Sequence, residues 1–163
     1  MQRTGTAALA GLMIGLISAS ASATDDPEKC AAVNSPITAS FFVDGCTSPF
    51  GLCTAGVIPS GLLTGTTLFT VLTLQPGETP DILLYTGELV ISTFYGDVVI
   101  QDQGALSQVD GTFFEFDEVV SGTGKFTNAN GTLFSQGVNT GTGFDSTISG
   151  QICGTPDNGP ILD

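Results

Sequence analysis

The chain has 163 residues and is strongly acidic, with sixteen Asp and Glu against three Lys and Arg and a net charge of −13. This charge repels phosphate backbones and anionic lipid headgroups, which excludes nucleic acid as a partner. The chain has no histidine, which excludes Ser-His-Asp and Cys-His catalysis and histidine metal sites. Solubility is the simplest reason for the acidity, and cation binding is the alternative.

The first 23 residues have the pattern of a signal peptide. Arg3 is followed by an uncharged apolar run from Ala7 to Ile17 and by the small residues Ala21-Ser22-Ala23. The run is too short for a bilayer core of about 30 Å, although an uncleaved anchor is the alternative. We expect cleavage between Ala23 and Thr24 and secretion to the periplasm or the medium. A tail over 24–35 and a single domain over 36–163 would follow.

All four cysteines lie after the expected cleavage site, and an even number in an exported chain predicts disulfides. Four cysteines allow three pairings. A local Cys46–Cys53 bridge with a Cys30–Cys153 bridge between the two ends is the favoured pairing. Because exported thiols are normally oxidised and histidine is absent, no metal site is expected.

The chain after residue 35 predicts strands and no helix. Its glycines are dispersed, and no segment repeats apolar residues with helical spacing. In the run over 63–74, Leu68, Leu72 and Leu74 are expected on one face, with Phe69 and Val71 on the other. Turn pairs such as Pro76-Gly77 and Asp110-Gly111 separate the runs. The expected strands cover 63–74, 82–94, 98–109, 112–120 and 143–153, with others in 36–45 and 119–137.

Seven or eight short strands predict a closed barrel or a sandwich. Several of these strands are apolar on both faces, which favours a barrel covered in part by a partner subunit. We therefore predict an all-β fold, with an antiparallel closed β-barrel or a sandwich as its architecture.

The glycine-rich segment over 119–137 reads as turn chemistry. A phosphate-binding loop requires Gly-Lys-Ser/Thr at the start of a helix, whereas here Lys125 precedes Phe126. Asn130-Gly131 is expected to form a tight connection between antiparallel strands, and Asn130-Gly131-Thr132 is also a glycosylation sequon. The residues assigned to turns and closure are Gly122, Gly124, Phe126, Asn130 and Gly131.

Carboxylates are the available acid–base groups. Glu115 and Asp117 share one face of a strand, about 7 Å apart at roughly 3.3 Å per residue. If that face lined a cavity, the two could share a proton or act as acid and base. The stronger expectation is that Phe114, Phe116 and Val120 are buried and that Glu115 and Asp117 face water. Glu118 would then lie on the apolar face and need a partner, or sit at the mouth of the barrel.

Other polar candidates are fewer. Asp97 and Asp102 flank a short apolar run and are expected at a solvated rim, with a loop cation as the alternative. Tyr85 and Tyr95 are expected as aromatic side chains with a satisfied hydroxyl, with ligand contact as the alternative.

Two segments resemble the allene oxide cyclase/dirigent superfamily. That family has a D-x-G-x-L strand before a GG-x-G-x-F-x-x-A-x-G segment, and Ser121 stands where the first glycine of the pair would be. The segment over 46–56 resembles the disulfide-bearing entry of secreted bacterial barrels of this type. The matching positions are Asp102, Gly104, Leu106, Gly122, Gly124, Phe126, Ala129 and Gly131.

The resemblance implies an eight-stranded barrel, often trimeric, with an apolar central cavity. Its members cyclise an unsaturated epoxide or steer radical coupling, without a metal or cofactor. The Glu- and Asn-bearing early strand of the cyclases has no counterpart in 36–45. We therefore expect this chain to share the barrel fold of that superfamily, and we assign none of the superfamily's catalytic residues to it.

Three functions compete. The first is a secreted binding or scaffold barrel for a small apolar ligand; the others are a self-assembling structural protein and a cyclase- or dirigent-like enzyme. A lumen packed by Phe69, Phe114 and Phe116 would favour the structural role, and a carboxylate beside a tyrosine in a cavity would favour the enzyme. A homo-oligomer, trimeric or larger, and a weakly held divalent cation are the other expected partners.

Overall fold

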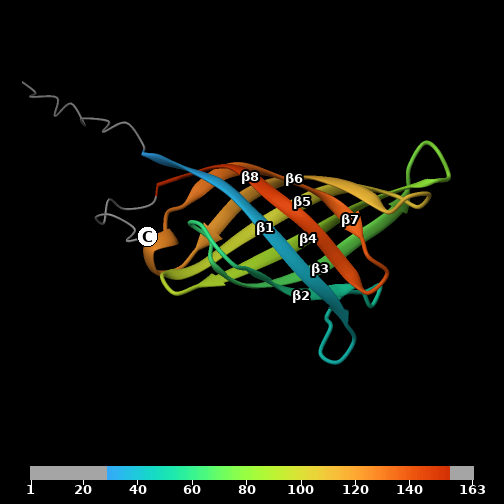
Figure 1. The fold of residues 1–163 in the computed structure, drawn as a ribbon, viewed down its shortest axis with the longest axis horizontal. Coiled ribbons are helices and arrows are strands. Elements are labelled where there is room, and N and C mark those ends of the chain that lie inside the picture. Colours follow the sequence, from blue (N-terminus) through green and yellow to red (C-terminus); the bar gives the residue numbers. More distant parts are fainter. Residues whose placement is uncertain (1–28, 155–163) are drawn as a thin grey trace, which may run out of the picture.

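The computed structural model describes residues 29–154, so the expected signal peptide lies outside the described residues. Eight antiparallel strands follow one another around a closed barrel, each paired with its neighbours in sequence, as predicted (Figure 1). One short 3-10 helix, η1 (Gly124–Phe126), lies between the sixth and seventh strands. The strands are β1 (Cys30–Phe42), β2 (Cys53–Ile58), β3 (Gly65–Pro76), β4 (Ile82–Thr93), β5 (Gly96–Ser107), β6 (Thr112–Gly122), β7 (Asn130–Asn139) and β8 (Gly143–Cys153).

The barrel closes where β8 pairs with β1. The antiparallel register runs from Cys30 opposite Cys153 to Ser40 opposite Gly143. Residues 30–35, which the sequence analysis places in a tail, are therefore part of the first strand. Val33 and Ser35 are buried and face the interior, which explains why this segment is held in the sheet.

A bulge in β3 changes which leucines face inward. The register shifts between Val71 and Thr73, so Leu72 is extra in the ladder. Leu74 consequently lines an internal cavity, while Leu68 and Leu72 remain exposed. The expectation that all three leucines share one face is wrong, because strict alternation does not hold across a bulge.

Apolar side chains fill one end of the barrel, which we call the closed end. Leu63, between β2 and β3, is 0% exposed, and Phe126 of η1 is 2% exposed. Both belong to the main hydrophobic cluster. The Lys125 amide donates a hydrogen bond to the Tyr95 carbonyl, which holds η1 against the β4–β5 turn. Gly124 supports this packing with a φ of 57°, a value that favours glycine.

The expected tight turn at Asn130-Gly131 is wrong. These two residues begin β7, and Gly131 pairs with Ile152 of β8. Residues 123–129, including η1, form the connection instead. The Asn-Gly pair misleads because its turn preference is local, whereas pairing with β8 places it within the sheet.

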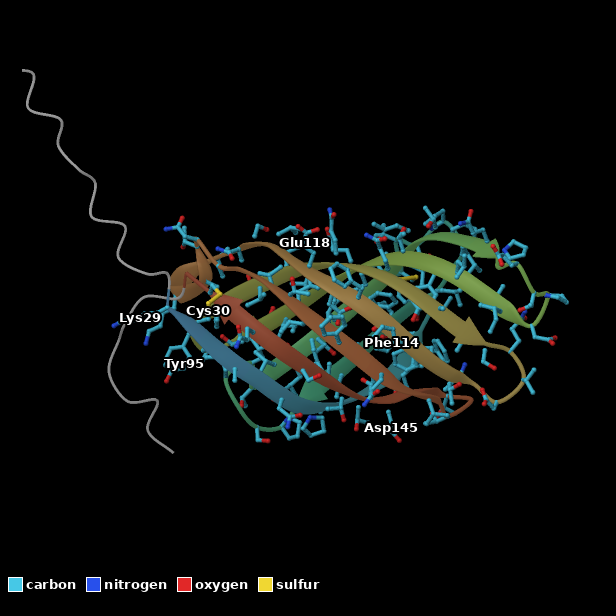
Figure 2. The ribbon with its side chains drawn as sticks, turned by 90° about the horizontal axis from the view of Figure 1, so that it is seen from above. Lys29, Cys30, Tyr95, Phe114, Glu118 and Asp145 are labelled. Carbon is cyan, nitrogen blue, oxygen red and sulfur yellow. A yellow bond between two sulfur atoms is a disulfide. The ribbon has the colours of Figure 1, made fainter. Side chains whose placement is uncertain are left out.

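The outside of the barrel carries an aromatic patch made of Phe114, Phe116 and Phe134. These rings are 51%, 40% and 40% exposed. Their centroids lie 5.9 Å apart for Phe114–Phe134 and 5.7 Å apart for Phe116–Phe134. Figure 2 places Phe114 and Glu118 on the barrel surface. Within residues 29–154, no helix is long and apolar enough to span a bilayer.

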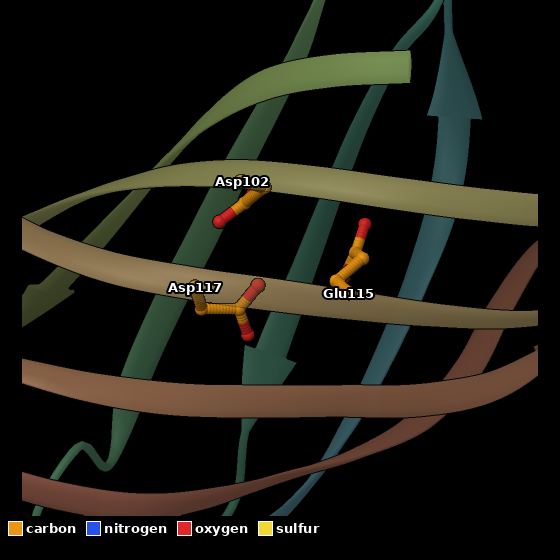
Figure 3. Close-up of side chains that lie close together, drawn as sticks. All are labelled: Asp102, Glu115 and Asp117. Carbon is orange, nitrogen blue, oxygen red and sulfur yellow. The ribbon is translucent and has the colours of Figure 1, made fainter. Parts of the chain in front are cut away.

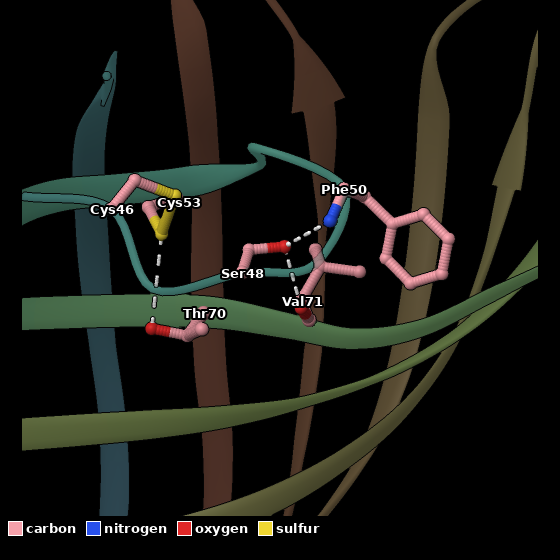
Figure 4. The surroundings of a disulfide bond; sticks show 6 residues. All are labelled: Cys46, Ser48, Phe50, Cys53, Thr70 and Val71. Atoms are coloured by element: carbon pink, nitrogen blue, oxygen red, sulfur yellow. Dashed lines mark hydrogen bonds between the residues drawn. A yellow bond between two sulfur atoms is a disulfide. The ribbon is translucent and has the colours of Figure 1, made fainter. Parts of the chain in front are cut away.

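Both predicted disulfides are present. Cys30–Cys153 joins directly opposed residues of β1 and β8, with a Cα–Cα distance of 3.9 Å. Cys46–Cys53 fastens the β1–β2 loop (Figure 4). In that loop Ser48 donates a hydrogen bond of 2.7 Å to the Val71 carbonyl of β3. The bridges thus secure the seam of the barrel and one loop at the opposite end.

We predict unequal effects of removing the two bridges. The Cys30→Ala/Cys153→Ala variant should lose about 4–5 kcal/mol of unfolding free energy, because this bridge closes the long loop, and Cys46→Ala/Cys53→Ala about 2–3 kcal/mol. Urea denaturation at pH 7 measures both. Equal losses, or a larger loss for the local bridge, would contradict this account of the seam.

Candidate functional site

Three carboxylates meet inside the barrel. Asp102 of β5 lies directly opposite Asp117 of β6, and Glu115 lies two residues before Asp117 on the same face. One carboxylate oxygen from each of the three residues lies within 4.8 Å of the other two. Figure 3 shows the three side chains gathered between the two neighbouring strands. We call Asp102, Glu115 and Asp117 the carboxylate cluster.

The expectation that Glu115 and Asp117 face water is wrong. Asp117 is 0% exposed and Glu115 is partly buried, while Phe114, Phe116 and Val120 face outward. The inner face of β6 is set at its two ends by Phe113 and Val119, both buried. Since each face of this strand carries large apolar residues, the alternation alone does not identify the inner one.

The expected position of Asp102 is wrong for a related reason. It lies in the middle of β5, where it is 1% exposed, and not at a solvated rim. Val98 and Ile100, at 0% exposure, fix the inner face of this strand, and Asp102 continues that face. The strand extends beyond the apolar run that the sequence shows.

Tyr85 reaches the cluster across a glycine. Along one row of the sheet Tyr85 of β4 opposes Gly104 of β5, which opposes Glu115 of β6. The Tyr85 hydroxyl donates a hydrogen bond of 2.8 Å to Glu115 Oε1. A Cβ at Gly104 would collide with the Tyr85 ring. Gly104 therefore lets the ring cross β5.

A second glycine has the same role in the next row. Gly87 of β4 opposes Asp102, and a Cβ at Gly87 would collide with the ring of Phe69 from β3. Phe69 and Tyr85 contact edge to face, with centroids 6.3 Å apart. The two glycines allow the two rings to lie beside the carboxylate cluster.

The hydrogen bonding of the cluster is incomplete. Ser135 of β7 donates a hydrogen bond of 2.6 Å to Asp117 Oδ2. Among the described residues, three buried oxygens have no hydrogen-bond partner: Asp102 Oδ1, Asp102 Oδ2 and Asp117 Oδ1. Buried polar atoms are normally paired, so these oxygens call for a proton or another donor between them.

Burial raises the pKa of every member of the cluster. Desolvation is the main cause for Asp102, whose pKa rises to about 10, with the charges of Glu115 and Asp117 adding to it. Desolvation raises the pKa of Glu115 to about 8 and that of Asp117 to about 6. It also raises the pKa of Tyr85. At neutral pH the cluster therefore retains at least one proton.

A small cavity borders the cluster. Its volume is about 60 Å³, and Asp102, Glu115, Ser135 and Tyr85 line it together with apolar side chains. A second cavity of about 120 Å³ lies toward the end opposite the closed end. The two share lining residues. The shared residues are Thr54, Phe69, Tyr85 and Phe144.

The structure does not bring the other sequence candidates into the cavities. Glu118 is exposed on the outer face, beside the aromatic patch. Tyr95 is 39% exposed at the β4–β5 turn, with the Lys125 ammonium 4.2 Å from its ring centroid. Asp97 lies at the start of β5, where its amide donates a hydrogen bond of 2.9 Å to Thr123 Oγ1.

Sequence reasoning missed Ser135, Gly87 and Phe144 as parts of the site. The available signal was the D-x-G-x-L pattern, since Asp102, Gly104 and Leu106 all face inward.

No protein-family model, no curated protein and no solved structure matches this chain.

We predict that the protein becomes less stable as pH rises. A carboxyl group with a raised pKa keeps a proton in the folded state that the unfolded chain releases above about pH 4. The contribution is complete below that pH and is lost through the folded pKa values of about 6, 8 and 10. Between pH 5 and 9 the unfolding free energy should fall in both the wild type and Asp102→Asn. The fall should be larger in the wild type, by at least about 1.4 kcal/mol.

Asp145→Asn is the control for this comparison. Asp145 is exposed on β8, so this substitution removes one carboxylate from the surface and leaves the cluster intact. Urea denaturation at pH 5, 7 and 9 gives all three profiles. A profile of Asp102→Asn that runs parallel to the wild type would show that Asp102 is ionised in the folded protein.

We also predict that Gly104→Ala destabilises the protein by about 1–3 kcal/mol, because overpacking displaces the Tyr85 ring. Adding Tyr85→Ala should relieve the collision. The double variant should then cost less than the sum of the single variants. Thermal unfolding of the four proteins measures the coupling, and additive losses would argue against the ring crossing Gly104.

Proposed function

We propose that this protein is a binding barrel for a small, largely apolar molecule that carries a polar end group. The observation that carries this proposal is the paired cavity, which is apolar along its walls and ends at the carboxylate cluster. A cavity with a few converging polar groups is the usual form of a small-molecule site. The polar end group would meet Tyr85, Asp102 and Glu115.

The size of the cavity restricts the ligand. Taken together, the two volumes of about 60 and 120 Å³ reach the size of the engineered cavity of about 150 Å³ that holds benzene. A compound with one ring fits this range. Phe69, Phe113 and Phe144 offer aromatic contacts to such a ring.

An enzyme is the second candidate, because a tyrosine and carboxyl groups with raised pKa values converge in the cavity. Such groups are suited to general acid–base catalysis near neutral pH. The reaction would be an isomerisation or cyclisation of a hydrophobic substrate, as the resemblance to the allene oxide cyclase/dirigent superfamily suggests. Glu115 and Asp102 would exchange protons with the substrate in this role.

Export and self-association complete the proposal. Two disulfides are consistent with an oxidising compartment, which supports secretion. The exposed patch of Phe114, Phe116 and Phe134 supports a homo-oligomer. Light scattering on the wild type and on Phe114→Gln tests assembly through this patch. An assembly should have a larger mass in the wild type than in the variant, whereas a monomer would give the monomer mass for both.

We predict that single-ring compounds bind in the cavity and that filling it abolishes binding. Ala39 lines the cavity, so Ala39→Phe should reduce the affinity for such compounds at least 10-fold. Thr38→Phe adds the same ring on the outer face of β1 and should bind as the wild type does. Ligand-detected NMR with phenol, indole and 2-phenylethanol measures binding.

The outcomes separate the functions. Equal binding by wild type and Ala39→Phe would place the compounds elsewhere and contradict the cavity as the binding site. Conversion of a compound by the wild type but not by Asp102→Asn, detected by mass spectrometry in the same incubation, would support the enzyme.

A further inference from the structure

The carboxylate cluster faces a cavity to which no basic side chain of residues 29–154 contributes. The described residues include two lysines, Lys29 and Lys125, and neither lines either cavity. The Lys125 ammonium lies over the Tyr95 ring at the closed end. No protein cation within residues 29–154 therefore neutralises the cluster from the cavity side.

Asp102 gives a second, geometric reason to expect a ligand at the cluster. Its side chain is 1% exposed, lines the cavity, and has no hydrogen-bond partner among the described residues on either oxygen. Together with Asp117 Oδ1, its two oxygens make three buried oxygens that lack a hydrogen-bond partner within residues 29–154. A primary ammonium group has three N–H donors and no acceptor, so its hydrogen-bonding capacity matches these three oxygens.

The walls indicate what the ammonium group is attached to. The cavity beside the cluster is lined by the rings of Phe69, Phe113 and Phe144 and by aliphatic side chains. Aromatic faces attract cations and also accept apolar groups. An anionic ligand would be repelled by the cluster and by the net charge of −13.

We propose that the barrel binds a small hydrophobic amine in its protonated form, with the ammonium group among Asp102, Glu115 and Asp117 and the apolar part between Phe69 and Phe144. This inference rests on the proposed binding function and names its ligand class. A calcium ion would require six to eight oxygen ligands, typically carboxylates, carbonyls and waters, whereas the rest of the lining offers hydroxyl groups and apolar side chains. The organic cation therefore suits the whole cavity better than a metal ion.

Proton release follows from the same arrangement. The polar groups that line the cavity here are Tyr85 from β4, Asp102 from β5, Glu115 from β6 and Ser135 from β7. Asp117 of β6 does not line it, but one of its oxygens lies within 4.8 Å of oxygens of Asp102 and Glu115. Glu88, on the outer side of β4, adds to the negative potential at Asp102. Because an ammonium ion favours ionised carboxylates, its binding should release protons and strengthen as pH rises from 5 to 8.

The test uses three matched ligands on the full-length exported protein at pH 7.5: 2-phenylethylamine, 2-phenylethanol and 3-phenylpropanoate. Isothermal titration calorimetry should give at least 10-fold tighter binding for the amine than for the alcohol, and no measurable binding of the acid. Titrations in buffers of different ionisation enthalpy should show proton release for the amine alone.

Variants test the role of the cluster. Asp102→Asn and Glu115→Gln should each reduce the ratio of amine affinity to alcohol affinity at least 5-fold, and the exposed control Asp145→Asn should keep the wild-type ratio. The wild-type ligand series remains decisive if a cluster variant does not fold.

The remaining outcomes overturn one claim or both. If the alcohol binds as tightly as the amine, the amine inference fails and the apolar binding function stands. If none of the three ligands binds, both fail. If calcium chloride binds in an Asp102-dependent manner and the amine does not, the cluster is a metal site and the inference is wrong.

Discussion

The antiparallel pairing of β8 with β1 is the constraint on which the rest of the structure depends. It closes the sheet, and in a closed sheet alternate residues of every strand must lie inside. Once Val98 and Ile100 occupy the interior, Asp102 has to follow them, and the Asp102–Asp117 pairing brings the second carboxylate beside the first. The carboxylate cluster is thus a consequence of register, and a disulfide between Cys30 and Cys153 fastens that register at the seam.

The closed end and the middle of the barrel are filled by different kinds of side chain. Leu63 and Phe126 fill the closed end with apolar contacts that contribute stability. The middle holds acids whose burial opposes folding, because desolvation disfavours their charged forms. Groups that cost stability and occupy a cavity are typical of functional sites. The closed end and the disulfides offset that cost.

The sequence predicted the architecture well and the site poorly. Dispersed glycines, turn pairs and short apolar runs are local signals, and they were sufficient to predict a barrel or a sandwich of seven or eight antiparallel strands. The disulfides followed from the even number of cysteines after the expected signal peptide. The inner face of β6 was not available from alternation, because Phe114 and Phe116 on one side and Phe113 and Val119 on the other are all apolar. Asn130-Gly131 and Leu74 were misplaced where pairing with β8 and a bulge in β3 override local preference. The contact of Tyr85 with Glu115 depends on Gly104, a residue from a third strand.

The most direct test of the account is the protonation of the cluster itself. Carbon-detected NMR of the side-chain carboxyl groups, titrated from pH 3 to 10 and assigned with Asp102→Asn and Glu115→Gln, follows each acid separately. The account predicts that Asp102 and Glu115 titrate well above the ordinary range near pH 4 and that at least one of them is protonated at pH 7. Titration of all three acids near pH 4 would show that they are solvated and would contradict a carboxylate cluster buried in the barrel.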